Sequence, residues 1–192
     1  MVRIFGGCII NSQTLSADLL LSDKCVDDFH ISDTEITNFQ YNQFLLATGN
    51  TAKTGAKQQP VVNVSWQEAV DFTKWLSKKH QKNYTLPNST QWQYAANTDG
   101  NSTKQEICNQ ANAYSCGNNA SQSAQNVKSL APNKWALYDM YGNVWEWIWA
   151  EAESEKTVKG GSWRSFDDIF NLNQQSAPAE KSADIGFRIV SD

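Results

Sequence analysis

The sequence predicts one α+β domain that spans residues 1–192. Helix-initiation patterns gather in the first half of the chain, whereas short strand-like pieces and turn-forming residues dominate the second half, which is typical of the α+β class. A length of 192 residues suits one sizeable core and is short for two. Hydrophobic residues make up 40% of the chain and include eight tryptophans, so we expect a folded domain and not a disordered tail.

The first helix is predicted to follow an extended piece at residues 29–35. Thr37 and Gln40 are three positions apart, which is the spacing of a capping box, and apolar residues follow at helical intervals. Gly49 stands where a left-handed residue would end this helix. Residues 50–59 are polar and rich in breakers, so we expect a loop there.

Two more helices are predicted after an extended piece at residues 60–64. Ser65 and Glu68 form a second capping-box pattern, followed by apolar residues on one helical face. Pro87 precedes the start of the third helix, which carries Trp92.

The second half is predicted to be irregular. Residues 97–134 show little periodicity, and a loop of this length inside a compact domain is usually functional or organised by a metal. Strand-like pieces are expected at residues 158–163 and 187–190.

Charge and hydropathy exclude some functions. A net charge of −4 offers no electrostatic footprint for nucleic acid. No apolar run approaches the roughly 20 residues needed to cross a bilayer. The first residues enter a strand-like segment without the apolar core of a signal peptide, so the protein is expected either to stay where it is made or to be a piece of a longer chain.

The four cysteines allow three disulfide pairings, and the sequence does not choose among them. Cys8 and Cys25 flank a connection between strand-like segments and could meet across a ladder. Cys108 and Cys116 bracket a short polar loop and could close it. The alternative is four free thiols in a reducing cytosol.

Seven ordered segments carry a resemblance to a known family. Their sequences are F-G-G, T-E-I-T-N-F-Q-Y-N-Q-F, P-V-V-N-V-S-W-Q-E-A, L-P-N-S-T-Q-W-Q-Y-A-A, Y-D-M-Y-G-N-V-W-E-W, G-G-S-W and G-F-R. They begin at residues 5, 34, 60, 86, 138, 160 and 186. Taken together, they resemble the formylglycine-generating-enzyme, or sulfatase-modifying-factor, family nearly end to end. The resemblance implies a variant of the C-type-lectin fold with little regular secondary structure.

Catalytic members of that family are copper oxidases that convert a sulfatase cysteine to formylglycine. Two cysteines shortly after the G-G-S-W segment hold the copper, because Cu(I) prefers soft thiolates. Those positions fall on Ser165 and Phe170 here, so oxidase activity and copper are not expected. Relatives that use iron need histidines from an additional domain, and this chain has only His30 and His80. Ser162 lacks a nucleophile-elbow pattern, so a hydrolase is not expected either.

The resemblance also implies a calcium site. The ligands would be the side chains of Asp139 and Glu146 and the backbone carbonyls of Met140, Gly142 and Val144. Ca²⁺ binds six to eight oxygens, and a tight turn flanked by acids supplies such a set.

In the alternative interpretation, Asp139 and Asn143 cap turns and Glu146 pairs with a buried cation such as Arg188. A second family calcium site would use Asn112 and the carbonyl of Ala113, but no acid follows before Lys128.

The segment from residue 164 to residue 185 matches the place of the family's catalytic groove. Its lining here would be apolar, amide and acidic, which suits a peptide, glycan or protein better than a phosphate. The candidate groove residues are Arg164, Phe166, Asp167, Asp168, Phe170, Asn171 and Asn173.

The sequence therefore predicts a non-catalytic ligand- or protein-binding module, such as a sensor or adhesion domain, stabilised by calcium. The resemblance implies an extracytoplasmic bacterial domain whose parent is a larger protein such as a membrane kinase or a lipoprotein. Two alternatives stay open: an enzyme of different chemistry with Asp167 or Asp168 as its base, and a structural assembly subunit.

Overall fold

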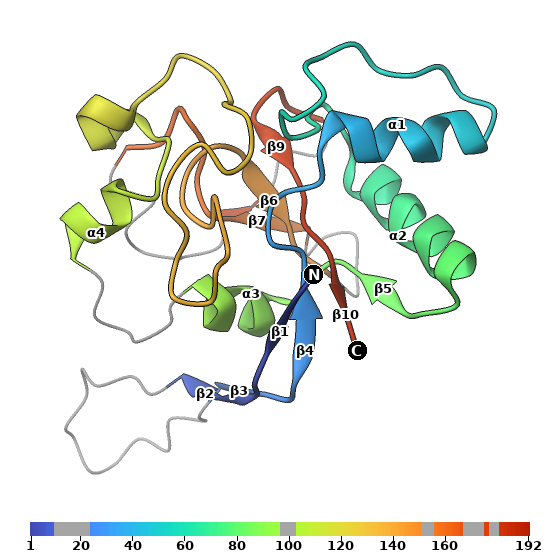
Figure 1. The fold of residues 1–192 in the computed structure, drawn as a ribbon, viewed down its shortest axis with the longest axis horizontal. Helices are drawn as coiled ribbons and strands as arrows, with labels where there is room; N and C mark the ends of the chain where they lie inside the picture. Colours follow the sequence, from blue (N-terminus) through green and yellow to red (C-terminus); the bar gives the residue numbers. More distant parts are fainter. Residues whose placement is uncertain (10–23, 97–102, 151–155, 167–174, 177–180) are drawn as a thin grey trace.

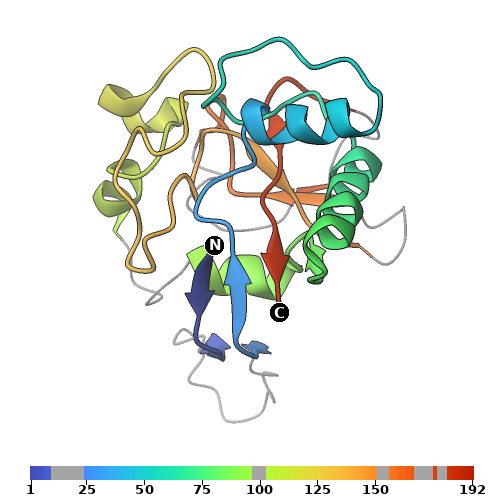
Figure 2. The same cartoon turned by 45° about the vertical axis from the view of Figure 1, so that its right-hand side comes forward.

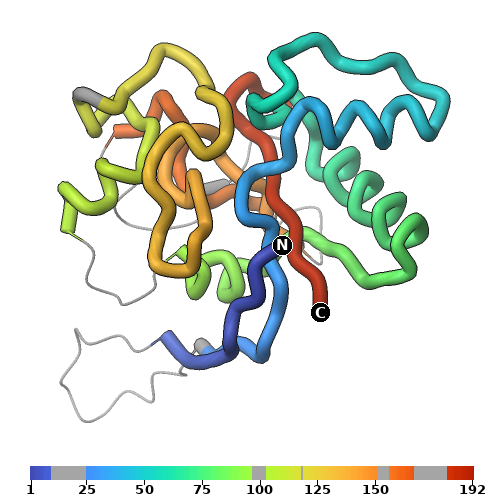
Figure 3. Tube along the Cα trace, in the orientation of Figure 1, coloured from blue at the N-terminus to red at the C-terminus, as the bar shows by residue number. Residues whose placement is uncertain are grey.

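The computed structural model describes residues 1–9, 24–96, 103–150, 156–166, 175–176 and 181–192, and it has the predicted α+β architecture (Figure 1). Its helices cluster in the first two thirds of the chain and pack around small sheets. The helices are α1 (Asn38–Ala47), α2 (Trp66–His80), α3 (Ser89–Ala96), α4 (Lys104–Cys108) and the 3-10 helix η1 (Tyr114–Asn119). The tube in Figure 3 shows how much of the chain between η1 and the last strands is irregular.

Short strands form three small sheets. The first has the order β1-β4-β10-β5, the second pairs β2 with β3, and the third has the order β8-β7-β6-β9. The strands of the first sheet are β1 (Val2–Ile4), β4 (Phe29–Ile31), β10 (Val190–Ser191) and β5 (Tyr84–Thr85). The others are β2 (Gly7–Ile9), β3 (Lys24–Val26), β6 (Trp145–Trp147), β7 (Thr157–Lys159), β8 (Gln175–Ser176) and β9 (Ile185–Gly186). Because β10 lies beside β4, the two chain termini are close together in both views (Figures 1 and 2).

The predicted helix starts are confirmed. Thr37 caps α1 and Ser65 caps α2, each through a reciprocal capping box with the residue three positions on. Gly49 follows the C-cap of α1 with a φ of 77°, in the left-handed region expected of it. Capping satisfies backbone N–H groups that the first turn leaves without partners.

The predicted strands are too long, for reasons visible in the backbone. After β4 the chain turns away from the strand path, and the Ser32 and Ile36 N–H groups donate to the carbonyls of Ile189 and Phe187. Of the strand expected over residues 187–190, only residue 190 lies in a strand, β10. The strand expected over residues 158–163 ends at residue 159, because the next two residues, Gly160 and Gly161, adopt left-handed φ values of 97° and 81°.

The extended piece predicted at residues 60–64 makes an isolated bridge at Pro60 instead of a strand. The loop predicted over residues 97–134 contains α4 and η1. The sequence carried a sign of α4, since Thr103 and Glu106 form a third capping box.

Two hydrophobic clusters fill the interior. One surrounds Trp92 and includes residues of β1, β4 and the segment around Met140. The other packs α1 and α2 against the end of the chain, with Phe72 in edge contact with Phe187 at 5.4 Å between ring centroids. Trp147 belongs to the second cluster and Ile148 to the first, so the segment that carries Glu146 contributes to both.

Both disulfides that the spacing suggested are present. Cys8 bonds to Cys25 directly across the β2–β3 ladder, and Cys108 bonds to Cys116 between α4 and η1. No helix in the described part of the chain is long and apolar enough to cross a membrane.

Candidate functional site

The loop of residues 139–146 has an unusual backbone. Asp139, Gly142 and Asn143 all adopt left-handed conformations, with φ values of 57°, 73° and 58°. A Cβ at Gly142 would lie 2.4 Å from the carbonyl oxygen of Asn112, so only glycine fits there. The Asn143 N–H donates to that same oxygen at 2.8 Å. The loop is therefore fixed in one conformation by its neighbours.

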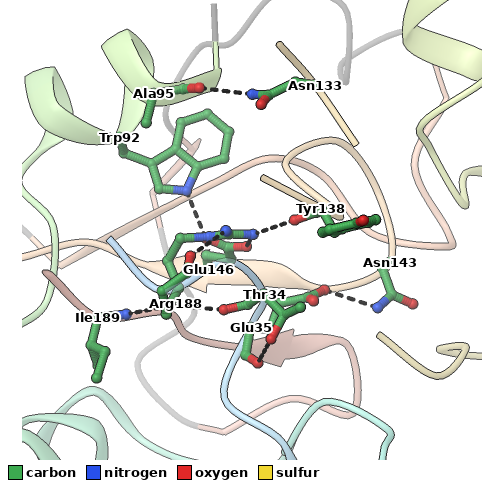
Figure 4. Close-up of polar contacts among 11 residues, drawn as sticks. Thr34, Glu35, Trp92, Ala95, Asn133, Tyr138, Asn143, Glu146, Arg188 and Ile189 are labelled. Atoms are coloured by element: carbon green, nitrogen blue, oxygen red, sulfur yellow. Dashed lines mark hydrogen bonds and ion pairs between the residues drawn. The ribbon is translucent and has the colours of Figure 1, made fainter. Parts of the chain in front are cut away.

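Glu146 lies on β6 and forms a buried ion pair with Arg188 (Figure 4). Arg188 Nε donates to Glu146 Oε2 and Nη2 donates to Oε1, both at 2.7 Å. Neither residue is exposed to solvent. Two parallel charge-assisted bonds make this the strong, bidentate form of the pair.

Further hydrogen bonds complete the arrangement around the pair. Trp92 Nε1 donates to Glu146 Oε2 at 2.6 Å, so this carboxylate accepts at least three bonds. Arg188 also donates to the backbone carbonyls of Ser32 and Tyr138. Burial lowers the pKa of Arg188, but its charge attraction to and hydrogen bond with Glu146, together with the charges of Glu35 and Asp139, more than offset this, so its pKa is raised overall.

A second acid, Glu35, lies beside the loop and is fully buried (Figure 4). Asn143 Nδ2 donates to Glu35 Oε1 at 2.8 Å, and the other carboxyl oxygen has no recorded hydrogen-bond partner. Burial raises the Glu35 pKa well above its usual value, and the charges of Asp139 and Glu146 raise it further. Sequence reasoning included Glu35 in a family segment without assigning it a role.

A third acid, Asp139, accepts a hydrogen bond from the backbone of another loop. Its Oδ2 accepts from the Lys128 N–H at 2.9 Å. Burial raises the Asp139 pKa, although that hydrogen bond lowers it. The pKa values of Glu35 and Asp139 are therefore both raised, and in both cases burial is the main cause.

The donor set fits calcium in part. Met140, Gly142 and Val144 are buried, and among the described backbone hydrogen bonds outside helices and strands their carbonyls do not appear as acceptors. A divalent ion at this place would favour the charged form of the nearby Asp139 and Glu35 carboxyls, whose pKa values burial raises. Glu146, however, has one lone-pair direction left after Arg188 and Trp92, so it can offer a single bond and not a bidentate one.

The side chain of Asn112, where the second calcium site of the family would lie, is engaged in hydrogen bonds within the protein. Asn112 Oδ1 accepts from the Ser121 N–H at 2.9 Å, and its Nδ2 donates to Ser123 O and Asn143 Oδ1. Asn112 therefore connects a surface loop to the loop of residues 139–146.

The predicted groove is described at two of its seven residues. Arg164 is exposed, with its guanidinium 4.5 Å from the centre of the Trp163 ring. Phe166 is 63% exposed and contacts Tyr114, also 63% exposed, at 4.7 Å between ring centroids. The predicted groove residues Asp167, Asp168, Phe170, Asn171 and Asn173 lie outside the described residues. Sequence reasoning did not find Tyr114, because it lies 52 positions from Phe166.

Ser165, which the family resemblance predicted to stand at a copper-ligand position, is buried and accepts a hydrogen bond from the Ser162 N–H at 3.0 Å. All four cysteines are in disulfides. Ser162 Oγ donates to Asp184 at 3.1 Å, so its contact is an acid and not a histidine.

Comparison with known proteins identifies the family of this chain. The model of the sulfatase-modifying factor enzyme 1-like domain, or FGE-sulfatase domain, matches residues 1–192. The chain belongs to this family. Members of the family share the α+β fold with small sheets, and the solved structure of PvdO from Pseudomonas aeruginosa covers the whole chain with a TM-score of 0.78. That protein is 22% identical and 93% of its own chain is covered, so it supports the fold alone.

Curated relatives include both active and inactive proteins. The formylglycine-generating enzyme of Streptomyces coelicolor is 27% identical over 177 residues, which take in 72% of this chain and 54% of the enzyme. The inactive Cα-formylglycine-generating enzyme 2 of Bos taurus is 26% identical over 156 residues, 69% of this chain and 50% of that protein. The kinase pkn1 of Chlamydia pneumoniae is 28% identical over 160 residues, 72% of this chain and 25% of the kinase. The chain thus corresponds to about half or less of the length of these relatives.

Proposed function

We propose that this domain binds a ligand or protein without catalysing cysteine oxidation. One observation carries the proposal: Ser165, at a copper-ligand position of the catalytic relatives, is a buried serine that accepts a backbone hydrogen bond. A hydroxyl is a poor ligand for Cu(I), and the four cysteines are engaged in disulfides. The inactive relative shows that the family includes members named as lacking the activity.

The binding surface in this proposal is the Phe166 face, defined here as Tyr114, Arg164 and Phe166. Its two aromatic rings and its guanidinium are exposed, although buried positions suit aromatic side chains better. Exposed aromatic and arginine side chains are enriched where proteins bind partners.

Calcium is part of the same proposal. Asp139, the carbonyls of Met140, Gly142 and Val144, and one oxygen of Glu146 would hold the ion. A calcium ion bound there would offset the charge of the carboxyl groups. It would also fix the conformation of the loop of residues 139–146, which runs into β6.

The proposed location is outside the cytoplasm, in a larger parent protein such as a membrane kinase or lipoprotein. Two disulfides in a domain of this size are typical of an oxidising compartment. The similarity to part of a kinase supports a multidomain parent.

Two measurements test the binding role. First, the protein is titrated with Cu(I) and incubated with a sulfatase-derived peptide that contains the substrate cysteine. We expect no copper bound at equimolar concentration and no change in the peptide mass. Formation of the aldehyde product would refute the non-catalytic role.

Second, amide NMR spectra are recorded with a library of peptides, oligosaccharides and nucleotides. We expect at least one class to shift the amide signals of Tyr114, Arg164 and Phe166. If ligands shift the amide signals of other residues and leave those of Tyr114, Arg164 and Phe166 unchanged, the Phe166 face is not the binding surface.

A further inference from the structure

A shallow cavity of about 700 Å³ opens between α4 and η1, beside the Phe166 face. We call it the α4–η1 pocket. Its described lining consists of amide and hydroxyl side chains, one lysine, a glycine and the Cys108–Cys116 disulfide. Its volume lies within the range of about 300–1,000 Å³ that is usual for small-ligand sites.

The amides of the pocket retain hydrogen-bonding capacity. Gln105 Nε2 donates to Asn109 Oδ1 at 3.1 Å, which fixes the two side chains against each other. Asn119 Nδ2 donates to the Cys108 carbonyl at 2.6 Å, so the disulfide loop orients this amide. Each amide has two N–H donors and a carbonyl acceptor, and these contacts use a fraction of that capacity.

The aromatic pair of the Phe166 face lies at the edge of this pocket. Tyr114 directly precedes Ser115, which lines the pocket. Ser115 Oγ donates to the Phe166 carbonyl at 2.9 Å, so Phe166 is held against the same wall. The rings of Tyr114 and Phe166 are tilted by 54° and together form an exposed, angled apolar surface.

From this combination we infer that the α4–η1 pocket and its aromatic edge bind a neutral oligosaccharide. The C–H face of a sugar ring packs against an aromatic ring, whose exposed face is apolar and electron-rich. Sugar hydroxyls both donate and accept, and side-chain amides match them in both roles. This inference rests on the proposed binding function and gives that function a ligand class.

Other ligand classes fit the pocket less well. A peptide is anchored by burying an apolar or aromatic side chain, and only the edge of this pocket is aromatic, since its described lining has no aliphatic or aromatic side chain. A phosphate group is usually bound by arginine or by several cations, whereas Lys104 is the one cation among the described lining residues.

The test is binding to an immobilised panel of neutral gluco-, galacto-, manno- and N-acetylhexosamine oligosaccharides, followed by saturation-transfer NMR on the members that bind. We expect a dissociation constant of about 1 mM or lower for at least one member. Tyr114→Ala and Asn109→Ala should each weaken binding about tenfold.

Phe39→Ala is the matched control. Phe39 is an aromatic residue 49% exposed on α1, which lies away from α4 (Figures 1 and 2), and its replacement should leave sugar binding unchanged. Thermal unfolding of all three variants establishes that they fold, since the residues replaced are exposed.

Three results would overturn the inference: no panel member binds, binding is unchanged in both pocket variants, or Phe39→Ala weakens it equally. If a peptide shifts the amide signals of the Phe166 face and no sugar does, the oligosaccharide inference fails and the proposed binding function stands. If the peptide assay yields the aldehyde, the proposed function fails whatever the sugars do.

Discussion

Replacing Arg188 with methionine should destabilise the protein strongly, because Glu146 would then be a buried carboxylate without its cation. Methionine keeps the unbranched aliphatic part of the arginine side chain and removes the guanidinium. The substitution deletes both 2.7 Å bonds to Glu146 and the bonds to the carbonyls of Ser32 and Tyr138.

The magnitude follows from the burial of the pair. Both side chains are at most 1% exposed, and removing one partner of such a pair costs about 3–5 kcal/mol of unfolding free energy. For a domain of this size, each kcal/mol corresponds to about 2–4 °C in Tm, so the expected decrease is on the order of 6–20 °C.

The assay is urea unfolding in calcium-free buffer with the disulfides intact, followed by the fluorescence of the eight tryptophans. The control is Lys181→Met, which breaks an ion pair with Glu68 of similar length, 2.6 Å, whose side chains are 47% and 37% exposed. Exposed pairs contribute about 0–1 kcal/mol, so this variant should differ little from the parent.

A double variant separates the pair from its surroundings. Arg188→Met combined with Glu146→Gln leaves no uncompensated charge, and Trp92 keeps an acceptor. We expect the double variant to lose less unfolding free energy than the two single variants lose when their losses are added. If Arg188→Met loses no more stability than Lys181→Met, the buried Glu146–Arg188 pair contributes no more to the unfolding free energy than an exposed pair does.

Three further predictions concern the same loop and the pocket. Calcium at 100 times its dissociation constant should add about 2.7 kcal/mol to the unfolding free energy, and Asp139→Ala should abolish that gain; equal calcium shifts in parent and variant would exclude the proposed ligand set. Gly142→Ala should cost about 3 kcal/mol or more in urea unfolding, because the new Cβ would lie 2.4 Å from Asn112 O, and a loss under about 1 kcal/mol would contradict the close contact. Replacing Cys108 and Cys116 together with serine should cost about 2.5 kcal/mol, as expected for a closed loop of nine residues, and unchanged stability would show that η1 is ordered without the bridge.

The elements that could be predicted from the sequence were those with local causes. The capping boxes at Thr37 and Ser65 each depend on two residues three positions apart, so the sequence alone predicts them. Strand lengths were not, because the bends at Ser32 and Gly160 depend on partners from elsewhere in the chain. Short strands also take much of their stability from these distant partners.

The candidate site was predictable to the same extent. Glu146 and Arg188 were named as a potential pair, and the structure joins them. Glu35 and Tyr114 were missed, since each reaches its site through contacts with residues far away in sequence. Periodicity and spacing carry no information about such contacts.

The order of synthesis places a constraint on how this domain folds. Residues 185–191 supply β9 at the edge of one sheet, β10 in the interior of another, and Arg188 between them. Until these residues leave the ribosome, β4 and β5 have no strand between them, and Glu146 has no buried cation. Earlier parts of the chain therefore stay partly assembled, with apolar surface and strand edges available to chaperones, until residues 185–191 have been made.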